Sequence, residues 1–217
     1  MRVVRIVDLS HPVSPSTQVY PGDPTPVFTP HATIGGDGYN LLHVAMGSQT
    51  GTHVDAPRHI RDDGNSVDRL PPTAFVGRGV VLDVRGRVGR GELIGPDAWD
   101  EADLGSGDIA LVHTGWSEHF GTDEYFHHPA LSVDACRWLL DRGVRTVGID
   151  APSIDPTGDE ELPAHHVIAD AGGVICENLT NLASIDFPDP LVSLLPIPFV
   201  GADGAPVRAV AMNLELF

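Results

Sequence analysis

Short apolar segments recur along the chain between clusters of glycine and proline, and most of them are too short to be helices. Val, Ile and Leu dominate these segments, which is typical of β-strands bounded by turns. We therefore predict strands at residues 3–7, 27–34, 41–46, 80–84, 109–113, 146–149, 174–176, 191–195 and 207–212. Strands accordingly dominate the predicted structure.

Three segments carry helix signals instead. One begins at Ser132, a favoured N-cap residue, and ends at Gly143, because glycine often terminates helices. A second helix is predicted to begin at Pro163, a favoured first-turn residue, and to end at Gly172 or Gly173. A shorter helical stretch is expected at residues 96–102. Strands with few helices, followed by strands alternating with helices, indicate an α/β fold with a mixed sheet.

The chain reads as one domain over residues 1–217, because no repeat, low-complexity tract or linker divides it. Its length and its 41% hydrophobic content allow a sizeable core. No secretory apolar segment and no window of about 18 apolar residues is present, so we expect a cytoplasmic protein that does not enter membranes. The two cysteines, Cys136 and Cys176, are too few for a disulfide framework and are expected to be buried thiols.

The charged residues narrow the possible chemistry. The chain has 13 Arg, no Lys, 30 Asp plus Glu and 11 His, with a formal charge of −17. Without lysine, neither a Schiff-base nucleophile nor a phosphate-loop lysine is available. The negative charge excludes nucleic acid and anionic membranes as expected partners, because both attract cationic proteins. A metal ion or a small molecule is the expected ligand.

One segment concentrates side chains that bind metal ions. Residues 47–59 read GSQTGTHVDAPRH, so His53, Asp55 and His59 fall within seven residues. Imidazole and carboxylate are preferred ligands of Zn²⁺ and Mn²⁺. In an extended segment the three side chains would share one face, and Gly51 would allow a tight turn before them. The spacing alone fits solvated loop residues equally well.

A second group of such side chains lies farther along the chain. His165 and His166 fall in the first turn of the predicted helix at 163, and Glu177 follows the predicted buried strand at 174–176. Functional groups in open sheets commonly stand at strand ends. A histidine in a helix is nevertheless more often a packing or surface residue than a ligand.

Many motifs in order resemble the cyclase family of metal-dependent hydrolases, which includes bacterial kynurenine formamidase, isatin hydrolase and polyketide cyclase-like proteins. The family signature, His-x-Gly-Thr-His-x-Asp-x-Pro-x-His, is similar to QTGTHVDAPRH at 49–59. Further similar motifs are YPGDP at 20–24, HTGW at 113–116, HP at 128–129, GIDAPSID at 148–155, PAHH at 163–166, CENL at 176–179 and GADGAPVRAVA at 201–211. The resemblance implies a layered β/β/α fold, similar to swivelling domains. It also implies a homodimer or homotetramer in which neighbouring subunits close the site.

The resemblance also implies roles for single residues. It places metal ligands at His53, Asp55 and Glu177, with Asp55 able to bridge two ions. It selects His165 over its neighbour as the fourth ligand, because the family pairs a histidine and a glutamate twelve residues apart. His59 is implied as the catalytic residue that transfers a proton.

One position departs from the family signature. Gln49 stands where the family has its first histidine ligand. A neutral amide oxygen is a weaker ligand, so Gln49 is a doubtful one, and its presence favours one metal ion instead of two or a harder ion such as Mn²⁺. His43 is an alternative source of the missing nitrogen.

The implied activity is hydrolysis of an amide, formamide or cyclic amide by water activated on Zn²⁺ or Mn²⁺, with one or two ions per chain. Trp116 and either Tyr20 or Phe28 are candidates for stacking on an aromatic substrate, although a tryptophan more commonly packs in the core. Asp150, Ser153 or Asp155 are expected to support the ligands. The GIDAPSID segment fits a simple turn equally well. Two other functions stay open: a cyclase or dehydratase acting on a polyketide, and a ligand-binding or structural oligomer impaired by Gln49.

Overall fold

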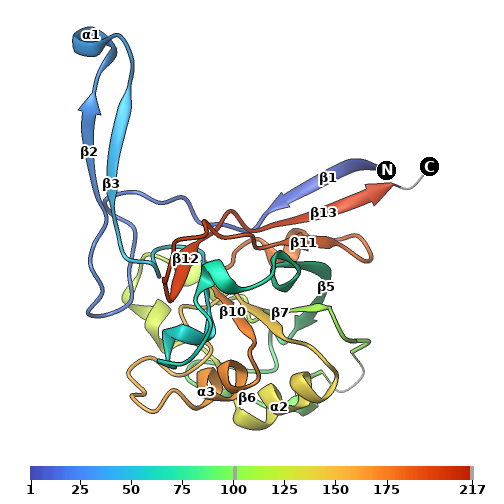
Figure 1. Cartoon of the computed structure of the whole chain (residues 1–217). Helices are drawn as coiled ribbons and strands as arrows, with labels where there is room; N and C mark the ends of the chain where they lie inside the picture. Colours follow the sequence, from blue (N-terminus) through green and yellow to red (C-terminus); the bar gives the residue numbers. More distant parts are fainter. Residues whose placement is uncertain (100–101, 216–217) are drawn as a thin grey trace.

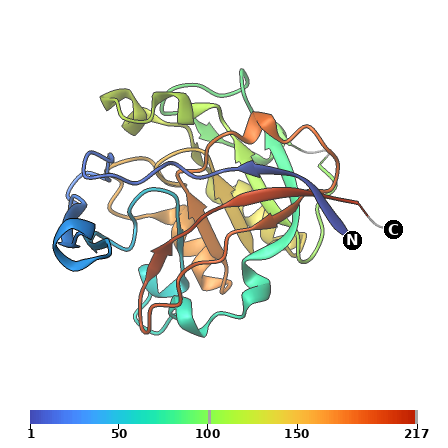
Figure 2. The same ribbon diagram turned by 90° about the horizontal axis from the view of Figure 1, so that it is seen from above.

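The computed structural model describes residues 1–99 and 102–215, and a nine-stranded mixed sheet organises them (Figures 1 and 2). The order of its strands is β1-β13-β11-β5-β7-β9-β10-β4-β12. Their bounds are β1 Arg2–Asp8, β4 His53–Asp55, β5 Val76–Asp83, β7 Ile109–His113, β9 Thr146–Ile149, β10 Val174–Glu177, β11 Leu191–Ser193, β12 Gly204–Pro206 and β13 Val210–Glu215. Strands β5, β7, β9 and β10 run parallel, and the strands outside them pair antiparallel. The predicted mixed-sheet α/β fold is therefore confirmed.

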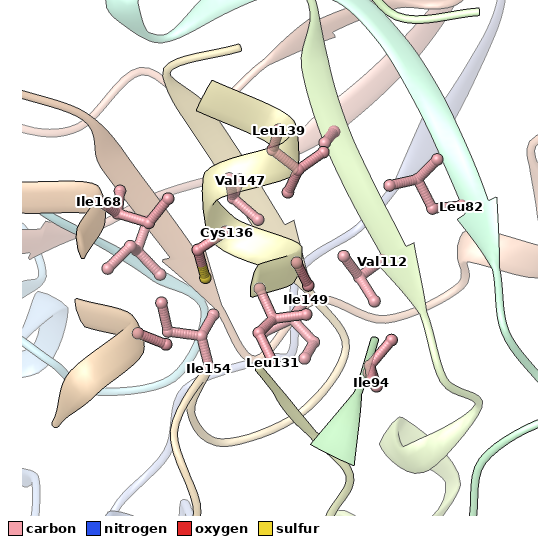
Figure 3. Packing of buried hydrophobic residues seen from close by; sticks show 14 of the residues in the cluster. Leu82, Ile94, Val112, Leu131, Cys136, Leu139, Val147, Ile149, Ile154 and Ile168 are labelled. Atoms are coloured by element: carbon pink, nitrogen blue, oxygen red, sulfur yellow. The ribbon is translucent and has the colours of Figure 1, made fainter. Parts of the chain in front are cut away.

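Two apolar cores separate three layers. Alternate residues of β7 point to opposite faces: Val112 belongs to the core beneath helices α2 (Val133–Asp141) and α3 (Pro163–Asp170), as Figure 3 shows for α2. Leu111 belongs to the second core, which β1, β11 and β13 cover from the other side. The layer order is the expected β/β/α. Cys136 and Cys176 are free and buried, one in each core.

Several predicted elements have the observed bounds or nearly so. The observed bounds of β7 and β9 match the predicted bounds exactly, because both strands are fully buried apolar runs with turns at their ends. Helix α2 has Ser132 as its N-cap, whose hydroxyl accepts a hydrogen bond from the amide of Ala135, and Gly143 follows the helix with a φ of 86°. The second helix ends earlier than predicted, at Asp170.

Other predictions are wrong in detail. The strand predicted at 27–34 ends at Ala32, because Thr33 caps the short helix α1 (Ile34–Asp37) with its hydroxyl. The strand predicted at 207–212 begins only at Val210. The helix predicted at 96–102 is a 3₁₀ turn, Pro96–Ala98, and residues 100 and 101 lie outside the described residues. The sequence did not predict β4, β12 or the small parallel pair of β6 (Leu93–Ile94) and β8 (Ala130–Leu131).

A two-stranded arm extends from the body (Figure 1). It consists of β2 (Val27–Ala32) and β3 (Leu41–Ala45), which pair antiparallel, with α1 at the tip.

The remaining short helices are the 3₁₀ helices η1 Pro57–His59, η2 Val67–Arg69, η3 Pro72–Ala74, η5 Trp116–His119, η6 Asp123–His127 and η7 Leu182–Ser184. Among the described residues, every helix is too short or too polar to cross a membrane.

Candidate metal centre

Strand β4 brings two candidate ligands beside a third. Its antiparallel pairing with β10 places His53 opposite Glu177 and Asp55 opposite Ile175. The Nδ1 of His53 lies 2.8 Å from the carbonyl oxygen of Gly51, whose positive φ of 66° forms the expected turn. The Nε2 of His53 therefore faces the carboxylates, 3.5 Å from Glu177 Oε2 and 3.6 Å from Asp55 Oδ1.

Helix α3 supplies the fourth candidate ligand from its first turn. The Nδ1 of His165 lies 2.7 Å from Asp155 Oδ2, which leaves Nε2 facing the same two carboxylates. That nitrogen is 3.4 Å from Glu177 Oε1 and 3.8 Å from Asp55 Oδ2. Glu177 is held in turn by the backbone amide of Ile154, which donates to Oε1 over 2.9 Å.

Asp55 provides a direct test of whether these residues suit a metal ion. Its side chain is 3% exposed, and neither of its carboxylate oxygens has a hydrogen-bond donor within the described part of the chain. A buried carboxylate without a donor is costly. Asp55 belongs to two groups of donor atoms, one with His53 and Glu177 and one with His59 and His165, and within each group the atoms lie within 4.8 Å of one another. Two imidazoles and two carboxylates suit a divalent cation.

The electrostatics agree with this assignment. Burial disfavours protonation of His53, but the charge of Asp55 and the hydrogen bond to Glu177 outweigh it and raise the pKa of His53 to about 9. Burial alone would raise the pKa of Glu177, whereas His165 and His53 hold it well below its usual range. The carboxylates thus favour positive charge between them, whether a proton or a metal ion carries it.

His59 and Gln49 lie at one side of this cluster. We expected His53, Asp55 and His59 to share one face of an extended segment. The extended strand ends at Asp55, and His59 belongs to the 3₁₀ helix η1, so strand alternation does not determine where His59 points. The ring of His59 lies 5.9 Å from that of His165, centre to centre. Gln49 Nε2 lies 3.1 Å from His59 Nδ1 and 2.9 Å from Asp203 Oδ2. Its oxygen is buried without a donor among the described residues, so it stays available to a cation.

The alternative nitrogen donor lies elsewhere. His43 is exposed on β3, where it pairs with Thr29 in the arm. By contrast, the carboxylate of Asp203 approaches His59 although the sequence reasoning did not single it out. The segment at 201–211 that resembles a family motif contains Asp203 and was the only signal for it.

A cavity of about 390 Å³ opens beside the candidate ligands. Its walls include Tyr20, Tyr125, Phe126 and Leu162, and besides the candidate ligand Glu177 three acidic residues line it: Asp23, Asp159 and Glu160. The hydroxyl of Tyr20 accepts a hydrogen bond from the amide of Gly158 over 2.9 Å. The sequence reasoning did not identify Tyr125, whose hydroxyl donates to Asn178 over 2.9 Å.

The two other aromatic residues expected to stack on a substrate lie outside these walls. The indole nitrogen of Trp116 donates to the carbonyls of Glu124 and Tyr125, and its ring packs against the core beneath the helices. Phe28 lies on β2 opposite Val44, in the arm.

The three residues expected to support the ligands have different roles in the structure. Asp155 contacts His165 directly and also accepts hydrogen bonds from the first amides of α3. Ser153 lines the cavity and accepts a hydrogen bond from the amide of Asp155. Asp150 is fully buried, but its carboxylate accepts from Thr114 and Gly115, so it holds the turn after β7 rather than a candidate ligand.

Comparison with known proteins places this arrangement in a family. The family model "Cyclase", described as "Putative cyclase", matches residues 7–156. A kynurenine formamidase of Salinibacter ruber is 37% identical over 211 residues, covering 94% of this chain and 96% of the relative. A kynurenine formamidase of Bacillus mycoides is 32% identical over 212 residues, covering 97% of this chain and 98% of the relative.

Solved structures agree in fold. Isatin hydrolase A from Labrenzia aggregata, bound to benzyl benzoate, has a TM-score of 0.88 at 26% identity, covering 97% of this chain and 94% of that one. A potential metal-dependent hydrolase with cyclase activity has a TM-score of 0.80 at 28% identity, covering 98% of this chain and 99% of that one. With a family model matched over most of its length and curated relatives above 30% identity, the chain belongs to the cyclase family.

Proposed function

We propose that this chain is a metal-dependent hydrolase that cleaves the C–N bond of an amide, formamide or cyclic amide. The observation that carries the proposal is the buried carboxylate of Asp55, which has no donor in the described chain and faces two imidazoles and Glu177. Relatives named kynurenine formamidase and a neighbour named isatin hydrolase support amide hydrolysis as the reaction.

The residues that would hold the metal ion are His53, Asp55, His165 and Glu177, with Gln49 as a weak additional ligand. One or two ions, Zn²⁺ or Mn²⁺, suit two imidazole nitrogens and two carboxylates. When bound, such an ion supplies Lewis acidity, which polarises a carbonyl group and acidifies water.

The surrounding residues prepare these ligands. Donation from Nδ1 to Gly51 and to Asp155 gives His53 and His165 the tautomer whose Nε2 carries a lone pair toward the carboxylates. His59 lines the cavity beside them and is the group that would pass a proton to the leaving nitrogen. Tyr20 and Phe126 offer aromatic surface to a small-molecule substrate.

We also propose that the chain forms a homodimer or homotetramer through its arm. Apolar side chains on the arm are strongly exposed: Val27 53%, Ile34 67%, Tyr39 56%, Leu41 48%, Leu42 50% and Val44 42%. These side chains lie on both faces of the two-stranded arm and at its tip, and exposed apolar surface of this kind marks interaction sites. Light scattering should give a multiple of the 23.1 kDa chain mass, and Leu42→Glu should lower it.

The proposed activity has a direct test. Protein purified without chelator should contain divalent metal by elemental analysis, and it should hydrolyse N-formylkynurenine, isatin or a simple lactam. Dialysis against chelator should abolish turnover, and Zn²⁺ or Mn²⁺ should restore it. Less than about 0.2 ion per chain after supplementation would contradict a metal centre. A metal-replete sample inactive on all three substrates would contradict the hydrolase and leave a carbonyl-activating cyclase or dehydratase.

A further inference from the structure

We propose that Asp203 is a positioning residue that fixes the orientation of His59, and that Gln49 and Ser48 hold Asp203 in place. The inference rests on the proposed function, because His59 is the group that would transfer the proton there. In its described hydrogen bonds the carboxylate of Asp203 contacts none of the four main candidate ligands, His53, Asp55, His165 and Glu177. Its partners are Ser48, His59 and Gln49, the weak additional ligand.

The amide of Gln49 has one sensible orientation. A carboxylate only accepts hydrogen bonds, so the Gln49 atom that lies 2.9 Å from Asp203 Oδ2 must be the nitrogen. Ser48 donates its hydroxyl to the other oxygen, Oδ1, also over 2.9 Å. Both oxygens of Asp203 are therefore held by neighbouring residues of one short segment, which restricts rotation of the carboxylate.

Asp203 also determines which nitrogen of His59 faces the cavity. His59 Nδ1 lies 3.3 Å from Asp203 Oδ2 and 3.1 Å from Gln49 Nε2. A charge-assisted bond from Nδ1–H to a carboxylate is stronger than a bond that Nδ1 would accept from the neutral amide of Gln49. His59 thus donates from Nδ1, and its Nε2, on the far side of the ring, keeps its lone pair toward the cavity that the ring lines.

The backbone fixes this carboxylate relative to the candidate metal ligands. Gly204 pairs with Asp55 across β12 and β4, and the carbonyl of Asp203 accepts from the amide of Ala56 over 2.8 Å. The carbonyl of Ala56 accepts in turn from the amide of His59, again over 2.8 Å. One strand junction therefore sets the positions of Asp55, Asp203 and His59 together.

The test compares Asp203→Asn with the metal-loaded wild type. We expect kcat to fall about 10- to 100-fold, the range found when a group that orients a metal-site histidine is removed. KM should stay within about twofold and metal content should not change, because the metal ligands and the cavity walls are kept. Asp203→Glu, which retains an acceptor of the same charge, should recover part of the lost kcat.

A spectroscopic readout separates positioning from a structural effect. In ¹⁵N-histidine-labelled protein, assigned with a His59→Gln sample, the His59 signals should show the Nδ1–H tautomer, and Asp203→Asn should change them. Ser48→Ala removes only the bond to Oδ1 and should lower kcat less than Asp203→Asn. Asp62→Asn is the matched control, because Asp62 is exposed and lies three residues from His59; it should match the wild type in activity, melting temperature and His59 signals.

Three results would overturn the inference. They are a wild-type kcat in Asp203→Asn, a loss of metal in parallel with kcat, or a His59 spectrum that Asp203→Asn leaves unchanged. Should Asp203→Asn fold poorly, Ser48→Ala and Asp203→Glu still give the kcat and spectral comparisons. Should the wild type hydrolyse no amide, the proposed function fails, whereas the His59 spectrum still decides whether Asp203 orients the ring.

Discussion

Replacing Asp55 by Asn should separate metal binding from folding. Asp55 is 3% exposed, and no described donor reaches its oxygens: the nearest imidazole nitrogens, on His53 and His165, are 3.6 Å and 3.8 Å away. A polar group buried without its partner costs about 1–3 kcal/mol, and more when charged. Asn keeps the shape and removes the charge. Asn also removes the charge that raises the pKa of His53, so the two effects oppose each other. Without metal, Asp55→Asn should therefore stay within about 1 kcal/mol of the wild type in stability.

With metal the wild type should become clearly more stable than the variant. An ion at 1,000 times its dissociation constant stabilises the folded wild type by about 4 kcal/mol. For a domain of this size that corresponds to a rise of about 8–16 °C in melting temperature. Asp55→Asn should lose most of this rise, because the variant lacks the carboxylate that faces both imidazoles.

Calorimetry after dialysis against chelator, followed by titration with Zn²⁺ or Mn²⁺, measures both effects. Asp62→Asn, at an exposed position, controls for the substitution itself and should behave as the wild type. The reasoning is refuted if metal-free Asp55→Asn is less stable than the metal-free wild type by more than about 1 kcal/mol, because Asp55 would then be satisfied by the protein. A full metal-dependent rise in the variant would place the ligands elsewhere.

Three further predictions concern stability and substrate binding. Arg78 binds Asp108 through two hydrogen bonds of 2.7 Å and 3.0 Å and lowers the pKa of its carboxyl, so Asp108→Asn should cost about 1 kcal/mol at pH 7. Because a lowered pKa stabilises the fold above the ordinary carboxyl pKa of about 4 and loses that effect below it, urea titrations should show the difference closing in acid. Tyr20→Phe removes the acceptor of the Gly158 amide; we expect KM to rise about fivefold with metal content unchanged, and an unaltered KM would exclude that loop from binding. A methyl group at Gly148 would lie 2.7 Å from a leucine methyl of the core, so Gly148→Ala should lose about 1–3 kcal/mol in the same titrations, and equal stability would show that the core adapts.

Local sequence determined much of this molecule. Strands β7 and β9 could be predicted to the residue, since a strand buried on both faces is a short apolar run bounded by turns. Helix α2 followed from Ser132 and Gly143, which satisfy the helix ends. Seven consecutive positions contained His53, Asp55 and His59, so one candidate ligand group was visible as a spacing.

Only the tertiary structure decided which side chains act together. Strand β4 is three residues long, too short to show periodicity, and it is fixed by pairing with β10 and β12. That pairing brings Asp203 to Gln49 and His59, which are 154 and 144 positions away in the chain. The sequence also suggested Asp150 and Trp116 for the site. In the structure Asp150 holds the turn after β7, and Trp116 packs against the core beneath the helices. A sequence records spacing within an element, whereas hydrogen-bond partners across a sheet depend on strand order and register, which no local pattern contains.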